Sequence, residues 1–165
     1  MSEVLAVSSW FLPALLVALT VGVLLAPLLQ RVLAVRRRAA LAIVLALGLI
    51  LAATLAPLPE SSARQASFSC DLSRIGPLSW TELTTLNDSS LNVLLFVPLG
   101  VATGVIFRSP HGRRLIMASL VLPVVIEAVQ LFLPGLGRGC QSADVFDNIS
   151  GLLVGQLVGA IIDRH

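Results

Sequence analysis

Five apolar stretches follow one another along this chain, separated by polar or basic segments. A helix of about 20 mainly apolar residues spans the hydrocarbon core of a bilayer. The stretches cover residues 10–29, 39–58, 91–107, 114–133 and 145–162. The pattern therefore predicts an all-α fold, namely a polytopic membrane bundle of about five transmembrane helices.

Basic residues gather in the connections that follow the first and third apolar stretches. These connections read QRVLAVRRR and RSPHGRR, and the C-terminal tail adds one further arginine. If five helices alternate in direction, all three basic segments lie on one side, which the positive-inside rule assigns to the cytoplasm. We therefore expect the N-terminus and the loops 59–90 and 134–144 to lie outside, in a multi-pass protein of the bacterial plasma membrane.

The start of the chain allows two interpretations. A signal peptide would place basic residues before its apolar run and a small-residue cleavage site after it. Here the start, MSEVLAVSS, is acidic and the arginines follow the run. We expect a retained transmembrane helix and a basic cytoplasmic loop over residues 1–38, and a transmembrane domain over residues 39–163.

Composition supports the membrane interpretation. Apolar residues make up 56% of the chain and charged residues 12%, whereas soluble domains carry about 25% charged residues. No basic patch stands on a soluble domain, so nucleic-acid binding is not expected.

The longer external loop contains the signals of a short helix. In PLSWTELTTLNDSS, Ser79 and Glu82 form a capping box. Trp80 and nearby leucines suit a helix over residues 80–86 that lies in the headgroup region, although a short soluble helix has the same pattern.

The two cysteines fall in the two external loops. Disulfides persist outside the cytoplasm, so we predict a bridge between Cys70 and Cys140; two free thiols are the alternative. Two cysteines without a nearby histidine do not complete a zinc site, and both histidines fall on the opposite side. We expect no metal and no cofactor.

Polar side chains occupy the outer ends of three apolar stretches. Glu127 and Gln130 are three residues apart and share a helix face. The last stretch begins QSADVFDNISG, where Ser142 or Asp144 could cap the helix. The candidate ligand-binding residues, from three helices and the loop 134–144, are Asn92, Glu127, Gln130, Arg138, Asp144, Asp147 and Asn148.

Small residues and one proline mark the expected helix contacts. Gly151, Gly155 and Gly159 repeat every four residues, which lets another helix approach closely. Pro98 and Gly100 interrupt the third stretch, where neighbouring helices must satisfy the backbone groups that proline frees. We expect these residues to pack helices together, and the glycine face could also join two copies in a homo-oligomer.

The ordered blocks LNVLLFVPLG, EAVQLF and GRGCQSADVFDNISGLLVG resemble the VanZ-like family, the teicoplanin-resistance VanZ family, over roughly residues 40–162. The segment CDLSRIGPLSW is similar to actinobacterial members. The resemblance implies a small membrane protein whose founding relatives are associated with reduced susceptibility to teicoplanin. The positions that match its signature are Asn92, Phe96, Pro98, Gly100, Glu127, Gln130, Arg138, Asp144, Asp147, Asn148 and Gly151.

The polar set allows three functional interpretations. A buried polar group in hydrocarbon costs several kcal/mol unless it is satisfied, so the set could be a purely structural hydrogen-bond network or a partner-binding fold. Intramembrane ionisable residues favour function, and Arg138 could hold a phosphate or carboxylate. We favour a binding module for a membrane lipid or lipid-linked envelope precursor. The alternative is an acid/base hydrolase or transferase that uses Glu127 and Asp147.

Overall fold

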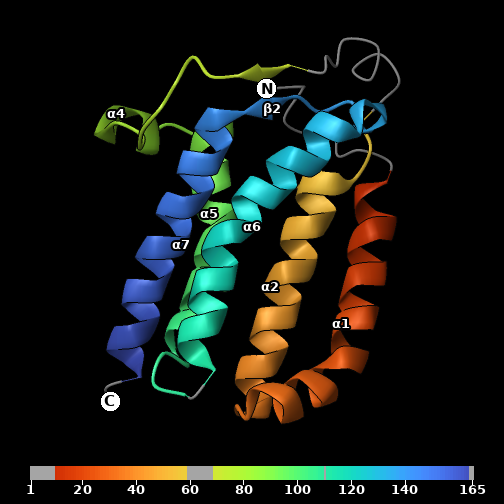
Figure 1. Cartoon of the computed structure of the whole chain (residues 1–165), viewed down its shortest axis with the longest axis vertical. Coiled ribbons are helices and arrows are strands. Elements are labelled where there is room, and N and C mark those ends of the chain that lie inside the picture. The colour runs from red at the N-terminus through yellow and green to blue at the C-terminus, as the bar shows by residue number, and fades with distance from the viewer. Residues whose placement is uncertain (1–9, 59–68, 110, 164–165) are drawn as a thin grey trace.

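A computed structural model describes residues 10–58, 69–109 and 111–163 of the chain. The fold is an all-α bundle, as the apolar pattern predicts (Figure 1). Its long helices are α1 (Phe11–Leu33), α2 (Arg37–Leu55), α5 (Asp88–Gly104), α6 (Gly112–Phe132) and α7 (Ser142–Ile162). Its short elements are β1 (Cys70–Asp71), α4 (Trp80–Leu83), the 3₁₀ turn η1 (Pro134–Leu136) and β2 (Cys140–Gln141).

The helices α1, α2, α6 and α7 are long and apolar enough to cross a membrane, whereas α5 has only 17 residues. At 1.5 Å per residue, α5 is about 26 Å long, slightly less than the hydrocarbon thickness. The prediction placed this helix at residues 91–107, but it begins at Asp88 and ends at Gly104. Its start is fixed by a capping box in which the Asn87 side chain accepts from the Ser90 N–H and the Ser90 hydroxyl accepts from the Asn87 N–H.

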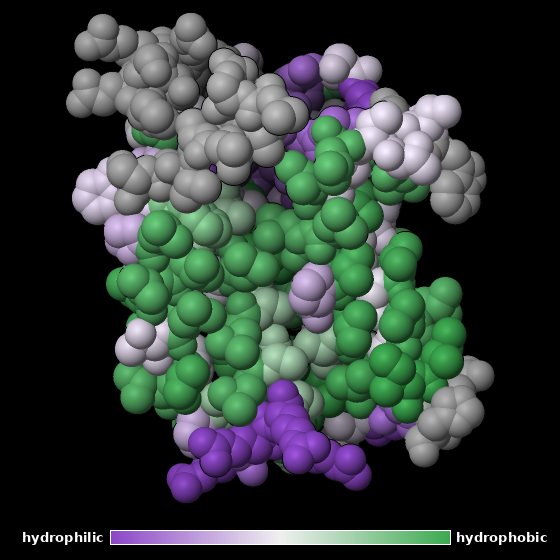
Figure 2. Space-filling model, turned by 180° about the vertical axis from the view of Figure 1, so that it is seen from behind, coloured by the Kyte–Doolittle hydropathy of each residue, from purple (hydrophilic) through white to green (hydrophobic). Residues whose placement is uncertain are grey.

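The two ends of the bundle differ in chemistry. The α1–α2 connection, the α5–α6 connection and the end of α7 lie together at one end, and β1, β2 and α4 lie at the other (Figure 1). Hydrophilic side chains gather at both ends of an apolar belt (Figure 2). Leu16 and Leu24 of α1 belong to this belt and are 64% and 73% exposed. The arrangement is that of a membrane protein, with the two basic connections on one side.

Glycines bring α5 and α7 into backbone contact. A Cβ atom at Gly151 would lie 2.1 Å from the Val93 carbonyl oxygen, and one at Gly155 would lie 2.3 Å from the Val97 carbonyl oxygen. Gly100 and Gly159 are similarly close to the opposite helix. The glycine face of α7 is therefore covered by α5 of the same chain, and a homo-oligomer through that face would require α5 to leave.

Two further expectations differ from the structure. Pro98 lies inside α5 but is exposed on its outer side, so it does not serve the α5–α7 contact. The helix expected at residues 80–86 is only the single turn α4, which ends at Leu83. After it, the Thr84 hydroxyl donates to the Thr81 carbonyl oxygen, and the Asn87 cap then starts α5. The Glu82 side chain of the predicted capping box lies outside the described part.

Candidate functional site

A disulfide fastens the long loop to the start of α7. Cys70 and Cys140 are bonded, with their Cα atoms 4.5 Å apart, so the structure contains the predicted bridge. The two cysteines are opposite one another where β1 and β2 pair in parallel, and Asp71 is opposite Gln141. Because β2 leads directly into α7, the bridge brings the segment after Cys70 onto the first turns of that helix.

Arg74 lies on this segment and forms an ion pair with Asp147 of α7. Its guanidinium also donates to the Gly76 carbonyl oxygen and to the Ser89 hydroxyl, at 3.2 and 3.3 Å. The Ser142 hydroxyl in turn donates to the Arg74 carbonyl oxygen at 2.7 Å. The loop is thus attached to α7 by an ion pair with a buried aspartate as well as by the disulfide.

The prediction that Ser142 or Asp144 caps α7 is wrong, because the loop that carries Arg74 contacts this end of the helix. The N-cap residue is Gln141, and its side chain makes no capping hydrogen bond. Ser142 is already the first helical residue, and its hydroxyl is used by the Arg74 carbonyl. Asp144 lies in the first turn of the helix and faces the bundle interior instead.

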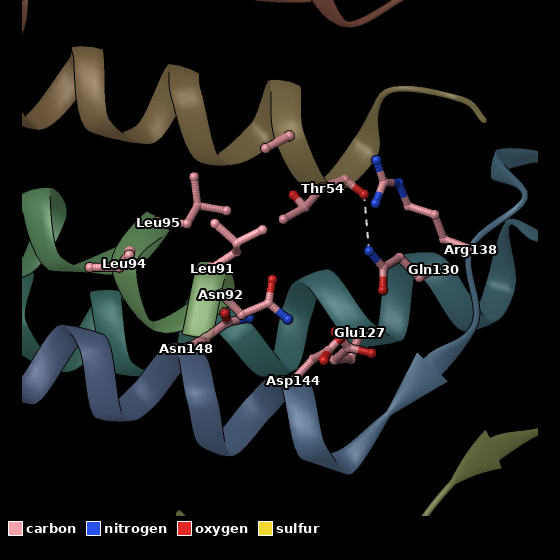
Figure 3. A pocket seen from close by; sticks show the side chains of 11 residues that line it. Thr54, Leu91, Asn92, Leu94, Leu95, Glu127, Gln130, Arg138, Asp144 and Asn148 are labelled. Atoms are coloured by element: carbon pink, nitrogen blue, oxygen red, sulfur yellow. Dashed lines mark hydrogen bonds between the residues drawn. The ribbon is translucent and has the colours of Figure 1, made fainter. Parts of the chain in front are cut away.

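A polar cavity of about 440 Å³ lies between α2, α5, α6 and α7 (Figure 3). All the predicted ligand-binding residues except Asp147 line it. These are Asn92, Glu127, Gln130, Arg138, Asp144 and Asn148. The remaining wall is mostly apolar and includes Leu91, Leu94 and Leu95 of α5.

Two buried amide oxygens in this cavity have no hydrogen-bond partner among the described residues. Gln130 is 6% exposed, and its Nε2 donates to the Thr54 carbonyl oxygen at 2.9 Å, which leaves Oε1 unpaired. Asn148 is 2% exposed, and its Oδ1 is also unpaired. Buried polar groups in folded proteins nearly always have a partner. Both side chains line the cavity but these two oxygen atoms are closed to solvent, so a donor bound in the cavity pairs with them only after the side chains turn towards it.

Glu127 is the most buried carboxylate of the cavity, at 4% exposed. Its Oε2 accepts from the Gln141 backbone N–H at 2.8 Å, which connects α6 to the strand before α7. Asp144 lies within electrostatic range of Glu127, and the two side chains approach one another from α6 and α7 (Figure 3). The Asn92 side chain interacts with the Asp144 carboxylate. Glu127 thus has one structural bond and one oxygen left for the cavity.

Arg138 lies at the mouth of the cavity. Its Nε donates to the Ala56 carbonyl oxygen at 3.3 Å, at the end of α2. Burial lowers the pKa of Arg138, but a guanidinium stays charged in proteins. It forms no ion pair within the described part of the chain. The cavity continues past Arg138 into a vestibule of about 720 Å³, whose wall includes Asp88 and Ser89.

Asp147 is placed differently from the other predicted residues. It is fully buried and directed at Arg74, and it does not line the cavity. The sequence did not predict Arg74 as the partner of Asp147, because no motif in the residues around Arg74 indicates a contact with α7. The predicted disulfide was the available signal, because it places a residue four positions after Cys70 close to the start of α7.

The cavity combines carboxylate and amide oxygens with one cation, and the amides of its lining can also donate. Glu127 and Asp144 supply carboxylate oxygens, and Gln130 and Asn148 supply amide oxygens, against the single cation Arg138. Residues 10–58, 69–109 and 111–163 contain no cluster of three side chains suited to a metal ion. The arrangement suits a ligand that presents hydroxyl or amine donors next to one anionic group.

The described cavity falls within the region that matches a known family. The VanZ/LLP1 family profile matches residues 41–163, which include nearly all of α2 and every later element. No curated protein and no solved structure matches the chain. Since the match covers most of the sequence, and covers every residue that lines the cavity, this membrane protein belongs to the VanZ/LLP1 family.

Proposed function

We propose that this protein binds the headgroup of a membrane lipid or of a lipid-linked cell-envelope component in the polar cavity. One observation carries the proposal: the buried oxygens Gln130 Oε1 and Asn148 Oδ1 have no partner in a cavity with Arg138 at its mouth. Orphaned buried acceptors cost free energy. A bound headgroup with hydroxyl or amine donors would satisfy them.

The apolar wall of the cavity supports a lipid rather than a free solute. Leu91 and Leu94 line the cavity and are 41% and 58% exposed, so that wall borders the apolar belt. A ligand that enters from the membrane could keep its acyl chains against this wall while its headgroup reaches the cavity. A phosphate would contact Arg138, since a guanidinium matches phosphate geometry.

The protein would lie in the bacterial plasma membrane, and its cavity would lie in the outer half of the bilayer. The arginine-rich connections support this orientation through the positive-inside rule. Lower susceptibility to lipoglycopeptides such as teicoplanin would then follow from binding an envelope precursor. The resemblance to the teicoplanin-resistance family supports that step.

Native mass spectrometry of the detergent-purified protein tests the proposal. The wild type should retain a phosphorus-containing lipid, and Arg138→Gln should weaken retention at least about tenfold, because a charge-assisted hydrogen bond contributes about 1.5–3 kcal/mol. Arg113→Gln removes the same charge at the other end of the molecule and should leave retention unchanged. Retention of the same lipid by Arg138→Gln at wild-type level would contradict the proposal.

The enzymatic alternative loses one of its two proposed residues. Asp147 is held by Arg74 outside the cavity, so it is not positioned as an ionised partner of Glu127. Asp144 is the carboxylate next to Glu127. Glu127→Gln separates the two functions: a binding protein should keep its lipid, because glutamine still accepts the Gln141 N–H, whereas acid/base catalysis would be lost.

A further inference from the structure

We propose a second lipid site, at the opposite end of the molecule from the polar cavity: a groove that binds an anionic phospholipid of the arginine-rich leaflet. The groove has a volume of about 1,080 Å³ and lies between the α1–α2 connection, the lower half of α5 and the end of α7. Arg36 and Arg38 lie at its rim, and its walls include Val97 and Val101 of α5 and Val105 directly after it.

The rim of the groove carries unpaired positive charge. Arg36 and Arg38 are exposed, and neither forms an ion pair with a described residue. The acidic side chain at the rim, Asp163, is already paired with Arg108 at 3.9 Å. Two cations therefore remain for a ligand. Figure 2 shows hydrophilic side chains that project at this end of the face, below an apolar surface.

The start of α2 adds to this positive field. Arg36 is the N-cap residue, its side chain makes no capping hydrogen bond, and the first turn of α2 contains no acidic residue. The first N–H groups of a helix carry partial positive charge and bind anions. A phosphate at the rim would contact both the guanidinium groups and this helix end.

The walls of the groove suit an acyl chain. Val97 and Val101 of α5 and its C-cap residue Val105 recur every four residues, so they form one continuous strip, and each is half-buried. Ala39 and Ala42 form the facing wall on α2, where their small side chains leave the groove open. An anionic phospholipid combines the two required parts, a phosphate at the rim and a chain along the strip.

Reconstitution of the full chain into vesicles of stated composition tests this site. The measurement is native mass spectrometry of protein released from vesicles that contain equal amounts of phosphatidylglycerol and phosphatidylcholine. The wild type should retain phosphatidylglycerol in preference to phosphatidylcholine. A charge-assisted hydrogen bond from an arginine to a bound phosphate contributes at least about tenfold, so Arg36→Gln/Arg38→Gln should lose at least roughly tenfold in this preference.

Three controls keep the result interpretable. Arg113→Gln/Arg114→Gln changes the net charge equally but does not touch the groove, so it should keep the preference. Arg36→Lys/Arg38→Lys conserves charge and should restore most of it. The Cys70–Cys140 bridge of the purified variants reports their orientation in the expressing cell, since a chain inserted backwards there would place both cysteines in the reducing cytoplasm.

Each outcome decides the proposal. Loss of preference only in the Arg36/Arg38 glutamine variant, with the disulfide intact, supports the site. No preference in the wild type, or an equal loss in the Arg113/Arg114 variant, would overturn it. Arg138→Gln should leave the preference unchanged, so the outer cavity and this groove can fail separately.

Discussion

Replacing Arg74 with alanine should leave one carboxylate inside the bundle without its cation. The Asp147 side chain is 0% exposed and that of Arg74 is 28% exposed. Removal of one partner from a buried ion pair costs about 3–5 kcal/mol, because the remaining charge keeps its desolvation cost. We therefore expect Arg74→Ala to lower the free energy of unfolding by about 3–5 kcal/mol.

The reciprocal substitution should cost less. Asp147→Asn keeps the shape of the side chain and removes the fully buried charge, while Arg74 is partly exposed and keeps its hydrogen bonds to Gly76 and Ser89. The expected loss is about 1–2 kcal/mol, in the range of a hydrogen bond to a charged group. The double variant Arg74→Ala/Asp147→Asn should then be more stable than Arg74→Ala alone.

The assay is unfolding in mixed detergent micelles, followed by the helical circular dichroism signal with the disulfide intact. Arg108→Ala is the matched control, because its pair with Asp163 is 3.9 Å long and its side chain is 66% exposed. Such a pair contributes less than about 1 kcal/mol. An equally small loss of stability in Arg74→Ala and Arg108→Ala, or a double variant that is the least stable of the set, would show that the Arg74–Asp147 pair does not neutralise a costly buried charge.

Three further predictions concern the fold. Ala34 has φ 51° after α1, so Ala34→Gly should raise the free energy of unfolding by about 1 kcal/mol in the same assay; a decrease would contradict the strain argument. Gly155→Ala must separate α5 from α7 by about 1 Å, since ordinary contact begins at 3.4 Å, and should cost roughly 1–3 kcal/mol. Gly139→Ala is the control, because a Cβ atom there would meet nothing within 4 Å, and it should leave the free energy of unfolding unchanged. An equal loss in Gly139→Ala and Gly155→Ala would argue against the close contact of α5 and α7. Cys70→Ser/Cys140→Ser should cost about 2–5 kcal/mol, and reductant should lower the melting temperature of the wild type only.

The apolar pattern predicted the helical bundle because each span must be long and apolar in lipid, whatever it contacts. Helix ends were predicted less well, since they depend on short-range hydrogen bonds. The Asn87–Ser90 capping box starts α5 three residues before the apolar run, and the N-cap of α7 is Gln141 rather than Ser142 or Asp144. The helix α4 is shorter than predicted because the segment that follows it forms the N-terminal cap of α5.

The cavity was largely predictable from depth and helix face. Glu127, Gln130 and Asn148 lie on helix faces that turn towards the interior, so periodicity placed them correctly. Asp147 is the neighbour of Asn148, and a rotation of about 100° per residue directs it to another side of α7. There it pairs with Arg74, which comes from 73 residues earlier in the chain. Such long-range partners are set by the whole fold, and local sequence does not specify them.

If the proposed function is right, a lipid headgroup satisfies the unpaired oxygens of the cavity. An experimental structure of the protein in nanodiscs made from native membrane lipid measures this directly. We expect headgroup density within hydrogen-bond distance of Gln130 Oε1 and the Arg138 guanidinium, with acyl density beside Leu91 and Leu94. A cavity that holds only water, or one that closes so that the Gln130 and Asn148 oxygens bond to the protein itself, would contradict it.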